Sequence, residues 1–448
     1  MNAYGGPADG NGPRPAGGTS PATPAPAAPG VPQPSTPNRP GAAFVAQPAA
    51  WQTWWNFQQV EFFRRAPRAG AVTAPPSGDS VGSDGTALAA MRARLLPRLL
   101  KDAKSPHATT REAALTALGR FGGNEAVAAL RAALRDENSL VRIAAILGLG
   151  STGASSASHT LLHLAFHGNG EGLRDGTPWV RQLSIVALGL GRRRGFTATV
   201  DPVIEALFKS PWSSDTERAE VRKACLLFVA LSPTTILDAP ILQSLRDESE
   251  NLGVRTRALE TIGLARLQNC VPDLLVMASH PRAELRRSAA LALGRIDDAG
   301  AIPALVRMAE NDNDEVARGY ALASLGRHGD KGPKGVLEKA LADGPKRLRP
   351  WASLGLGMRA WFSNRAVGST APLLAALEHE SNISTRGAHA IALGLTREPL
   401  AANPLASLLD GSSDTDTRQL ASLGLALVGV TPARERLVAH VVEDASPR

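Results

Sequence analysis

The chain repeats one short pattern along most of its length, in which an arginine is followed eight residues later by glycine or alanine. Two clear copies are Arg111–Gly119 and Arg142–Gly150. Most copies follow one another after 31 to 33 residues, and three steps are longer, at 37 to 41 residues. Such a period is typical of a solenoid, in which each repeat covers the apolar face of its neighbour. The ten opening arginines are Arg111, Arg142, Arg181, Arg222, Arg255, Arg286, Arg318, Arg349, Arg386 and Arg418.

The apolar positions within each copy indicate a helix. The residue seven places after the arginine is always aliphatic, and the residue three places after it is Ala, Ser or Cys except at His389. Positions 0, 3, 4 and 7 share one helical face, so we expect this face to be buried. An amphipathic stretch precedes each copy, as at residues 125–134. The sequence therefore predicts an all-α, right-handed superhelical solenoid of about ten helical hairpins.

The segments outside the repeats have a different composition. Residues 1–48 are rich in Pro, Gly and Ala, which favours a disordered tail. Residues 49–65 hold six of the chain's 19 aromatic residues, and residues 66–85 have the composition of a flexible linker. The solenoid is predicted to cover residues 86–432, followed by a C-terminal cap helix and tail over residues 433–448.

The frame Val-Arg-x-x-Ala-Ala-x-x-Leu-Gly, with an aspartate a few residues earlier, resembles the HEAT-repeat superfamily. It is particularly similar to the short bacterial repeats named after phycobilisome lyases. The Trp-rich segment resembles one that precedes the array in some bacterial HEAT-repeat proteins of unassigned function. This resemblance implies an armadillo-like α-solenoid over about residues 86–430. The name of the repeat also suggests a lyase-like accessory role, for which the sequence offers no cysteine or acid–base set.

The net charge of +8 makes nucleic acid a candidate partner. The excess is spread thinly, because residues 1–85 hold 5 Lys and Arg against 4 acids, and the rest of the chain holds 44 against 37. We therefore favour a non-catalytic scaffold that binds a protein, with a nucleic-acid-binding array as the alternative. The chain has no phosphate-loop or nucleophile motif, so we expect neither enzyme activity nor a cofactor.

The ten arginines are predicted to be structural, since position 0 lies on the buried face. An acid stands six residues before the arginine in five repeats, at Asp136, Asp175, Asp312, Asp343 and Glu380. A guanidinium group fits a carboxylate or the carbonyl oxygens of a turn. We expect each arginine to close the turn between the two helices of its own hairpin.

A partner-binding site is predicted on repeats five to eight. Positions 2, 5 and 9 after the arginine point away from the buried face. Position 2 is small or aliphatic elsewhere but becomes Arg257, Tyr320 and Trp351 in this stretch, and position 9 adds Arg295 and Arg327. Trp, Tyr and Arg dominate binding hot spots. The alternative is that a neighbouring first helix or a long loop covers these rings.

Two further clusters have alternative interpretations. Trp51, Trp54 and Trp55 are predicted to cap the exposed first helix of the array, or else to dock on a partner or a membrane surface. His159, His163 and His167 recur every four residues, which would bring them to one helical face as weak metal-ligand candidates. Without a second ligand set, we expect no metal site.

The chain contains no apolar run of membrane-spanning length and shows no signal peptide at its N-terminus. The sequence as it stands therefore predicts a cytoplasmic protein. An exported or envelope-associated protein would follow if a leader had been removed.

Overall fold

The computed structural model describes residues 50–65, 93–168, 178–196, 200–212, 214–235, 237–363, 369–429 and 435–438. These residues form helices and turns, and none of them lies in a β-strand. The predicted tail over residues 1–48 and the predicted linker over residues 66–85 lie outside the described residues. Of the predicted C-terminal segment, residues 435–438 are described and are helical.

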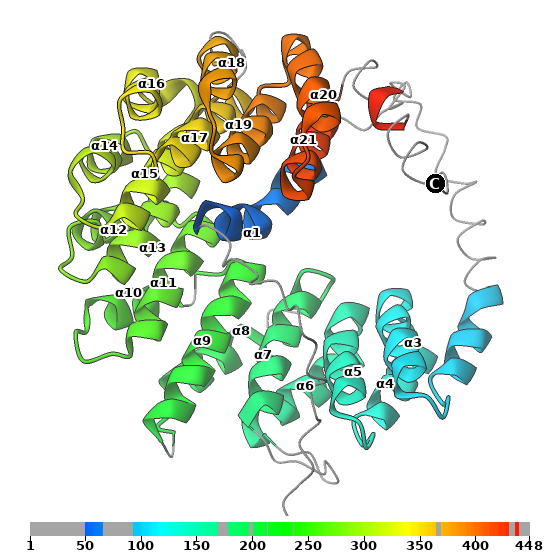
Figure 1. Ribbon diagram of the computed structural model, residues 1–448. Helices are drawn as coiled ribbons and strands as arrows, with labels where there is room; N and C mark the ends of the chain where they lie inside the picture. Colours follow the sequence, from blue (N-terminus) through cyan, green and yellow to red (C-terminus); the bar gives the residue numbers. More distant parts are fainter. Residues whose placement is uncertain are drawn as a thin grey trace, which may run out of the picture. The chain divides into compact units, whose positions relative to one another are not determined.

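Ten helical hairpins follow one another over the described part of residues 93–429 (Figure 1). The first helices are residues 93–102, α4 (Asn124–Ala133), α6 (Ser155–His167), α8 (Val200–Lys209), α10 (Asp238–Arg246), α12 (Val271–Met277), α14 (Ala301–Asn311), α16 (Lys334–Ala342), α18 (Thr370–His379) and α20 (Ala402–Gly411). The second helices are α3 (Ala108–Phe121), α5 (Ser139–Thr152), α7 (Pro178–Arg192), α9 (Asp215–Leu231), α11 (Leu252–Ala265), α13 (Ala283–Arg295), α15 (Glu315–Arg327), α17 (Arg349–Phe362), α19 (Ile383–Thr396) and α21 (Thr415–Val428). The predicted all-α solenoid is confirmed.

The second helices carry most of the core. Each packs along its length on the second helix of the next hairpin, whereas successive first helices touch one another much less. Position 7 after the arginine is buried in every repeat, from Leu118 to Leu425, and position 3 is buried as well, including His389. The buried face expected from the helical period is therefore confirmed.

Glycine at position 8 allows the second helices to approach closely. A Cβ atom on Gly326 of α15 would lie 2.1 Å from the carbonyl oxygen of Gly355 on α17. A Cβ atom on Gly150 of α5 would lie equally close to the carbonyl oxygen of Ala187 on α7. Any side chain at these two positions, even the Cβ of alanine, would force the helices apart, which explains why glycine stands there.

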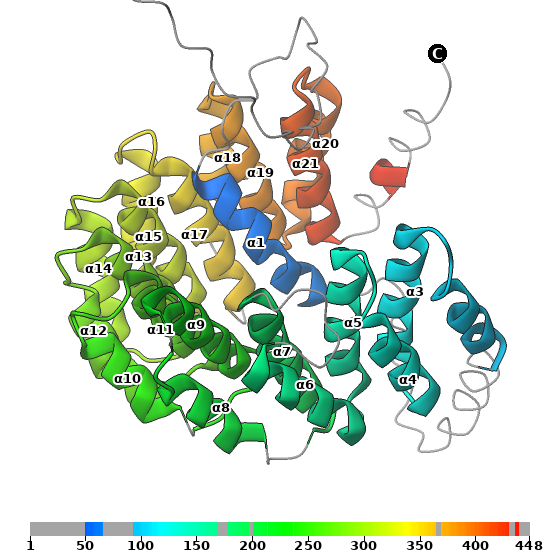
Figure 2. The ribbon, with the colours of Figure 1, turned by 90° about the horizontal axis from the view of Figure 1, so that it is seen from below.

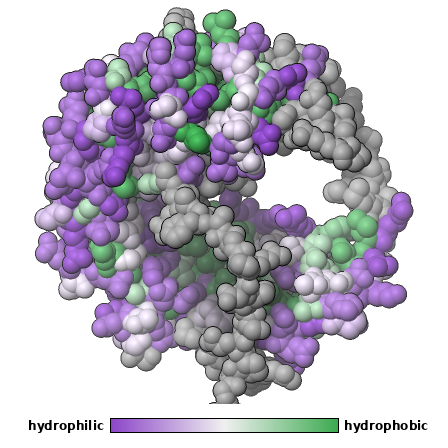
Figure 3. All heavy atoms as spheres, viewed as in Figure 1, coloured by the Kyte–Doolittle hydropathy of each residue, from purple (hydrophilic) through white to green (hydrophobic). Residues whose placement is uncertain are grey.

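The turns and the outward faces are polar. Asn138 accepts hydrogen bonds from the first backbone N–H groups of α5, and Asp314 does the same for α15. The side chains around α10 to α16 form a mainly hydrophilic outer surface (Figure 3). None of the helices in the described part of the chain is both long enough and apolar enough to cross a bilayer.

One helix outside the repeats, α1 (Ala50–Arg65), lies on the second helices of the later repeats (Figures 1 and 2). Its contacts reach α13, α17 and α19. The expectation that this Trp-rich segment caps the first helix of the array is wrong. The reason is that Tyr320 and Trp351 form an aromatic surface against which Trp54 of α1 packs. A helix can pack on repeats that are distant from it in the sequence.

Candidate functional site

The surface under α1 is formed by four second helices. We call it the α1 seat and define it by Arg295 at the end of α13, Tyr320 on α15, Trp351 on α17 and Ser384 on α19. Trp51 Nε1 donates a hydrogen bond to Ser384 Oγ at 3.0 Å. Further along α1, Arg295 donates to Gln58 Oε1 at 2.9 Å. The helix is thus held at two places by polar contacts and crosses the seat between them.

An aromatic cluster lies at the centre of the seat. The rings of Trp54 and Trp351 meet edge to face, with centroids 5.6 Å apart. Tyr320 also meets Trp351 edge to face, at 5.3 Å. Such pairs add about 0.5 to 1.5 kcal/mol each beyond the area that they bury. Trp351 keeps 3% of its surface exposed and Trp55 keeps 1%, so α1 and the array share a closed apolar contact.

The predicted partner site is brought together only in part. Tyr320, Trp351 and Arg295 belong to the seat, but Arg257 pairs with Glu260 on its own helix at 2.6 Å. Arg327 lies over the ring of Phe362, at 4.8 Å. The expectation that Trp351 is open to a partner is wrong, because α1 covers it.

Position 2 does not lie away from the core, because Trp351 belongs to the buried core and the same position is also buried at Ala144 and Ala388. Within the described residues, α1 covers Trp351 through the ring of Trp54. The covering helix comes from a distant part of the chain, which the repeat pattern cannot indicate.

Sequence reasoning missed two residues of the seat, Ser384 and Gly319. Gly319 lies under the indole of Trp351, where a Cβ atom would come within 2.6 Å of a ring atom. It is one of two glycines at position 1 of the repeat; the other, Gly387, lies in repeat nine. This departure from the repeat next to Tyr320 was a usable signal. No comparable signal marks Ser384.

The arginine ladder joins neighbouring repeats. Arg111 donates two hydrogen bonds to the carboxylate of Asp136, both at 2.8 Å. Arg286 does the same to Asp312, at 2.8 and 2.7 Å. Both acids belong to the next repeat, so these side-chain pairs link two hairpins. The same two arginines also donate to carbonyl oxygens of their own turns, Arg111 to Ser105 at 2.9 Å and Arg286 to His280 at 2.9 Å. Arg142 likewise bonds to its own turn, through the carbonyl oxygen of Asp136 at 2.8 Å.

The remaining ladder arginines use other acceptors. Arg255 and Arg318 donate from Nε to carbonyl oxygens of the first helix of their own hairpins, at 3.1 and 3.0 Å. Arg181 lies over the ring of Trp212 at 4.5 Å. Four further members are half-buried: Arg222, Arg349, Arg386 and Arg418. We therefore interpret the ladder as structural.

The paired acids of the ladder remain charged at neutral pH. Burial alone would raise the pKa of Asp312, but hydrogen bonds from Arg286 and from the backbone of Asp314 lower it below its ordinary value. The pKa of Asp136 is lowered in the same way, against the effect of burial, by Arg111 and the backbone of Asn138. These ion pairs thus form with both partners fully ionised.

The three histidines considered as metal-ligand candidates lie on one helix, and both cysteines are buried. The rings of His163 and His167 lie 4.6 Å apart along α6, which also carries His159. Within the described ranges, no group of three His, Cys, Asp or Glu side chains is arranged to hold a metal ion. Burial raises the pKa of Cys270 to about 11 and also raises that of Cys225, so both thiols are protonated at neutral pH.

Stacked helical hairpins that share one continuous core define the α-solenoid class of proteins. A family model for HEAT repeats matches residues 95–175 and 239–326. The chain is a HEAT-repeat protein. HEAT repeats are generally non-catalytic, and their solenoids are typical protein-interaction scaffolds.

No curated protein sequence matches the chain. Among solved structures, the CpcE–CpcF complex of phycocyanin lyase from Nostoc sp. PCC7120 has 17% identity and a TM-score of 0.38, covering 56% of this chain and 96% of that one. YibA of Escherichia coli has 16% identity and a TM-score of 0.32, with coverages of 71% and 97%. Human deoxyhypusine hydroxylase has 20% identity and a TM-score of 0.27, with coverages of 61% and 98%. None of these similarities bears on function.

Proposed function

We propose that the chain is a non-catalytic protein-binding scaffold whose α1 seat receives an amphipathic, Trp-bearing helix from a partner protein. The observation that carries this proposal is α1 itself. It is a helix outside the repeats that buries Trp51, Trp54 and Trp55 on the array. A helix laid in a groove through a few anchors is a common mode of peptide recognition.

The chemistry of the seat supports this function. Large aromatic side chains that meet in a water-excluding contact make up most binding hot spots. Trp351 and Tyr320 supply such a surface from two adjacent repeats, and Trp54 fills it. Ser384 and Arg295 add one polar contact on either side of this cluster, which defines the direction of the bound helix.

The contact between α1 and the seat carries an energetic cost that a partner helix would avoid. Trp54 Nε1 is buried and has no acceptor among the described residues. A buried donor without an acceptor costs about 1 to 3 kcal/mol. A partner helix that fills the same aromatic surface without this cost would displace α1. In the absence of a partner, α1 would protect the apolar seat from water.

Charge on the second helices favours a protein over nucleic acid as the partner. Beside the seat, Arg257 pairs with Glu260 and Arg287 pairs with Asp314. Acids thus neutralise these two cations, whereas a binding surface for nucleic acid presents a continuous positive stripe. The aromatic side chains of the seat also favour a protein as the partner.

The experiment uses the full-length chain with Trp54→Ala and Trp55→Ala, which weakens the docking of α1. A fluorescent peptide of residues 48–66 is added, and its binding is followed by anisotropy. We expect the double variant to bind the peptide at least about tenfold more tightly than the wild type, because the tethered α1 competes at high effective concentration. A peptide that carries Trp54→Ala serves as the control and should not bind.

Equal, negligible binding of the peptide to the two proteins would contradict the proposal. Circular dichroism establishes first that the double variant is folded. Should it unfold, Trp54→Ala alone replaces it in the same titration.

A further inference from the structure

A cavity of about 410 Å³ adjoins the N-terminal end of α1. Ala50 and Trp51, the first two residues of α1, contribute to its lining. Residues near the beginnings of α15, α17 and α19 line it as well, among them Val316, Pro350, Trp351, Ser384 and Thr385. We call this place the N-terminal cavity. It is continuous with the α1 seat, because Trp351 and Ser384 belong to both.

The buried part of the lining is mainly apolar. Trp51 and Trp351 each keep only 3% of their surface exposed. Pro350 is also buried, and Val316 is half-buried. Two indole rings, a proline ring and an aliphatic side chain form a wall that favours an apolar group over a polar one.

The charged residues of the lining lie at its rim. Arg347 pairs with Glu315 at 3.4 Å, and their side chains are 85% and 41% exposed. Lys346 is exposed, and Glu380 accepts a hydrogen bond from the backbone N–H of Asn382 at 2.8 Å. An apolar centre inside a polar rim is the usual arrangement of a pocket that receives an anchor side chain of a partner.

The first residue of α1 is too small to fill this space. Ala50 is exposed and ends in a single methyl group. The core of a well-packed interface reaches the density of a protein interior, so a cavity of this size beside two buried Trp rings indicates a larger natural occupant. We propose that the partner helix carries a large apolar side chain at the position of Ala50, which fills the N-terminal cavity. The proposal rests on the function proposed above and names the anchor by which a partner would bind more tightly than α1.

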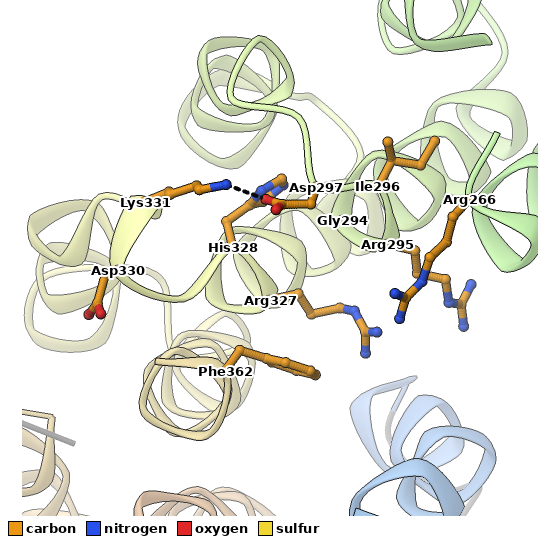
Figure 4. Close-up of a pocket in the computed structure, with 10 residues that line it drawn as sticks. All are labelled: Arg266, Gly294, Arg295, Ile296, Asp297, Arg327, His328, Asp330, Lys331 and Phe362. Atoms are coloured by element: carbon orange, nitrogen blue, oxygen red, sulfur yellow. Dashed lines mark hydrogen bonds and ion pairs between the residues drawn. The ribbon is translucent and has the colours of Figure 1, made fainter. Parts of the chain in front are cut away.

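The other end of the seat borders a cavity of different chemistry (Figure 4). That cavity measures about 380 Å³, and Arg295 of the seat lines it. Charged side chains from several elements also line it, among them Arg266, Asp297 and Lys331, and Asp297 bonds to Lys331 at 2.7 Å. An apolar side chain placed there would remove charged groups from water, which is costly. We therefore assign the apolar anchor to the N-terminal end of the bound helix.

Water is the competing occupant of the N-terminal cavity. Ordered water bridges polar groups in many interfaces without weakening them. If water filled the cavity in every complex, a larger side chain at the position of Ala50 would bring no gain in affinity. The two explanations therefore differ in a binding measurement.

The test compares two peptides of residues 48–66, one with the natural sequence and one with Ala50→Leu, a change that preserves high helix propensity. Each is titrated into the full-length Trp54→Ala/Trp55→Ala chain. We expect the Leu peptide to bind about tenfold more tightly, because its side chain leaves water for the cavity. Burial of an apolar group involves no charge, so the gain should persist at high salt.

Matched controls locate the effect. A peptide with Thr53→Leu adds the same side chain at an exposed position of α1 and should gain no more than about twofold. Val316→Phe fills the cavity from α15 and should reduce the gain of the Ala50→Leu peptide to about twofold or less. Val276→Phe, at an exposed position of α12 outside the cavity, should preserve the full gain.

A second measurement needs no peptide. In the otherwise natural full-length chain, Ala50→Leu should stabilise the docking of α1 and slow the hydrogen exchange of its amides about tenfold. Thr53→Leu should change these rates by no more than about twofold. This measurement tests the cavity even where Val316→Phe fails to fold.

The outcomes separate this inference from the proposed function. If neither peptide binds, the proposed function fails. If both peptides bind equally and Ala50→Leu does not slow exchange, the apolar anchor is refuted and the seat remains. A gain that Thr53→Leu matches, or that survives in folded Val316→Phe, refutes the anchor as well.

Discussion

The seam between neighbouring repeats and the seat of α1 are both helix-on-helix contacts, but they are built differently. In the seam between α13 and α15, Ser324 Oγ donates to the carbonyl oxygen of Ala290 at 2.8 Å, and a Cβ atom on Gly294 would lie 2.4 Å from the Ser324 hydroxyl. Backbones there approach closely, and small residues are required. In the α1 seat, large rings from Trp54 and Trp351 fill the space between the helices.

This difference separates a structural contact from an exchangeable one. The seam recurs from repeat to repeat, so damage to one copy weakens two neighbours that depend on each other. The seat occurs once in the described part of the chain and depends on a few anchors. We therefore expect changes in the seam to reduce the free energy of unfolding of the array, and changes in the seat to alter mainly the docking of α1.

The largest effect is expected from Arg286→Ala in the seam. The side chains of Arg286 and Asp312 are 11% and 5% exposed, so the variant would leave a buried carboxylate without its partner. Breaking such a pair costs about 3 to 5 kcal/mol, which chemical denaturation would detect. Arg307→Ala, on the exposed side of α14, is the matched control and should change the stability by about 0.5 kcal/mol or less. Equal stability of the two variants would show that the ladder does not stabilise the array.

A smaller effect, confined to mild acid, is expected from His389. Its Nδ1 lies 2.6 Å from Ser353 Oγ, across the seam between α17 and α19. Burial, together with Arg349 and against the opposing effect of Glu380, lowers the pKa of His389 to about 4. The unfolded chain takes up this proton near pH 6.5, but the folded chain does not.

The stabilisation from His389 is therefore complete above about pH 6.5 and is lost as the pH falls towards 4. The loss amounts to at most about 3 kcal/mol. Denaturation curves of the wild type and His389→Gln should change differently with pH in this window. Parallel pH profiles would contradict the assignment. The acids of the ladder act at lower pH, because their lowered pKa values preserve stability until the pH falls below about 4.

The smallest effect is expected from Ser384→Ala in the α1 seat. The variant removes the acceptor of Trp51 Nε1, which should weaken the docking of α1 by about 1 kcal/mol. Hydrogen exchange of the α1 amides should then accelerate about fivefold, whereas amides in α17 and α19 keep their rates. Ser381→Ala, at an exposed position nearby, is the control. Faster exchange throughout the array would mean that α1 is part of the core.

The repeat pattern was enough to predict the helices and the buried face. Leu118, Leu293 and Leu425 are buried because the same packing contact recurs in every repeat. A contact that recurs ten times at a similar spacing can be recognised in a single sequence. The pattern also located Tyr320 and Trp351 as exceptions to the repeat. It did not predict that Arg111 and Arg286 reach the acid of the next repeat. From the spacing alone, that acid was expected to pair with the arginine six residues after it.

By itself, therefore, the sequence determined the class of fold and the place where the repeat departs from its own rule. Only the tertiary structure decided that α1 covers Trp351 and that Gln58 meets Arg295. The physical reason is that periodic contacts are local and repeated, so their residues share one spacing. The contact between α1 and the array is single and long-range, and its partners share shape and charge but no period.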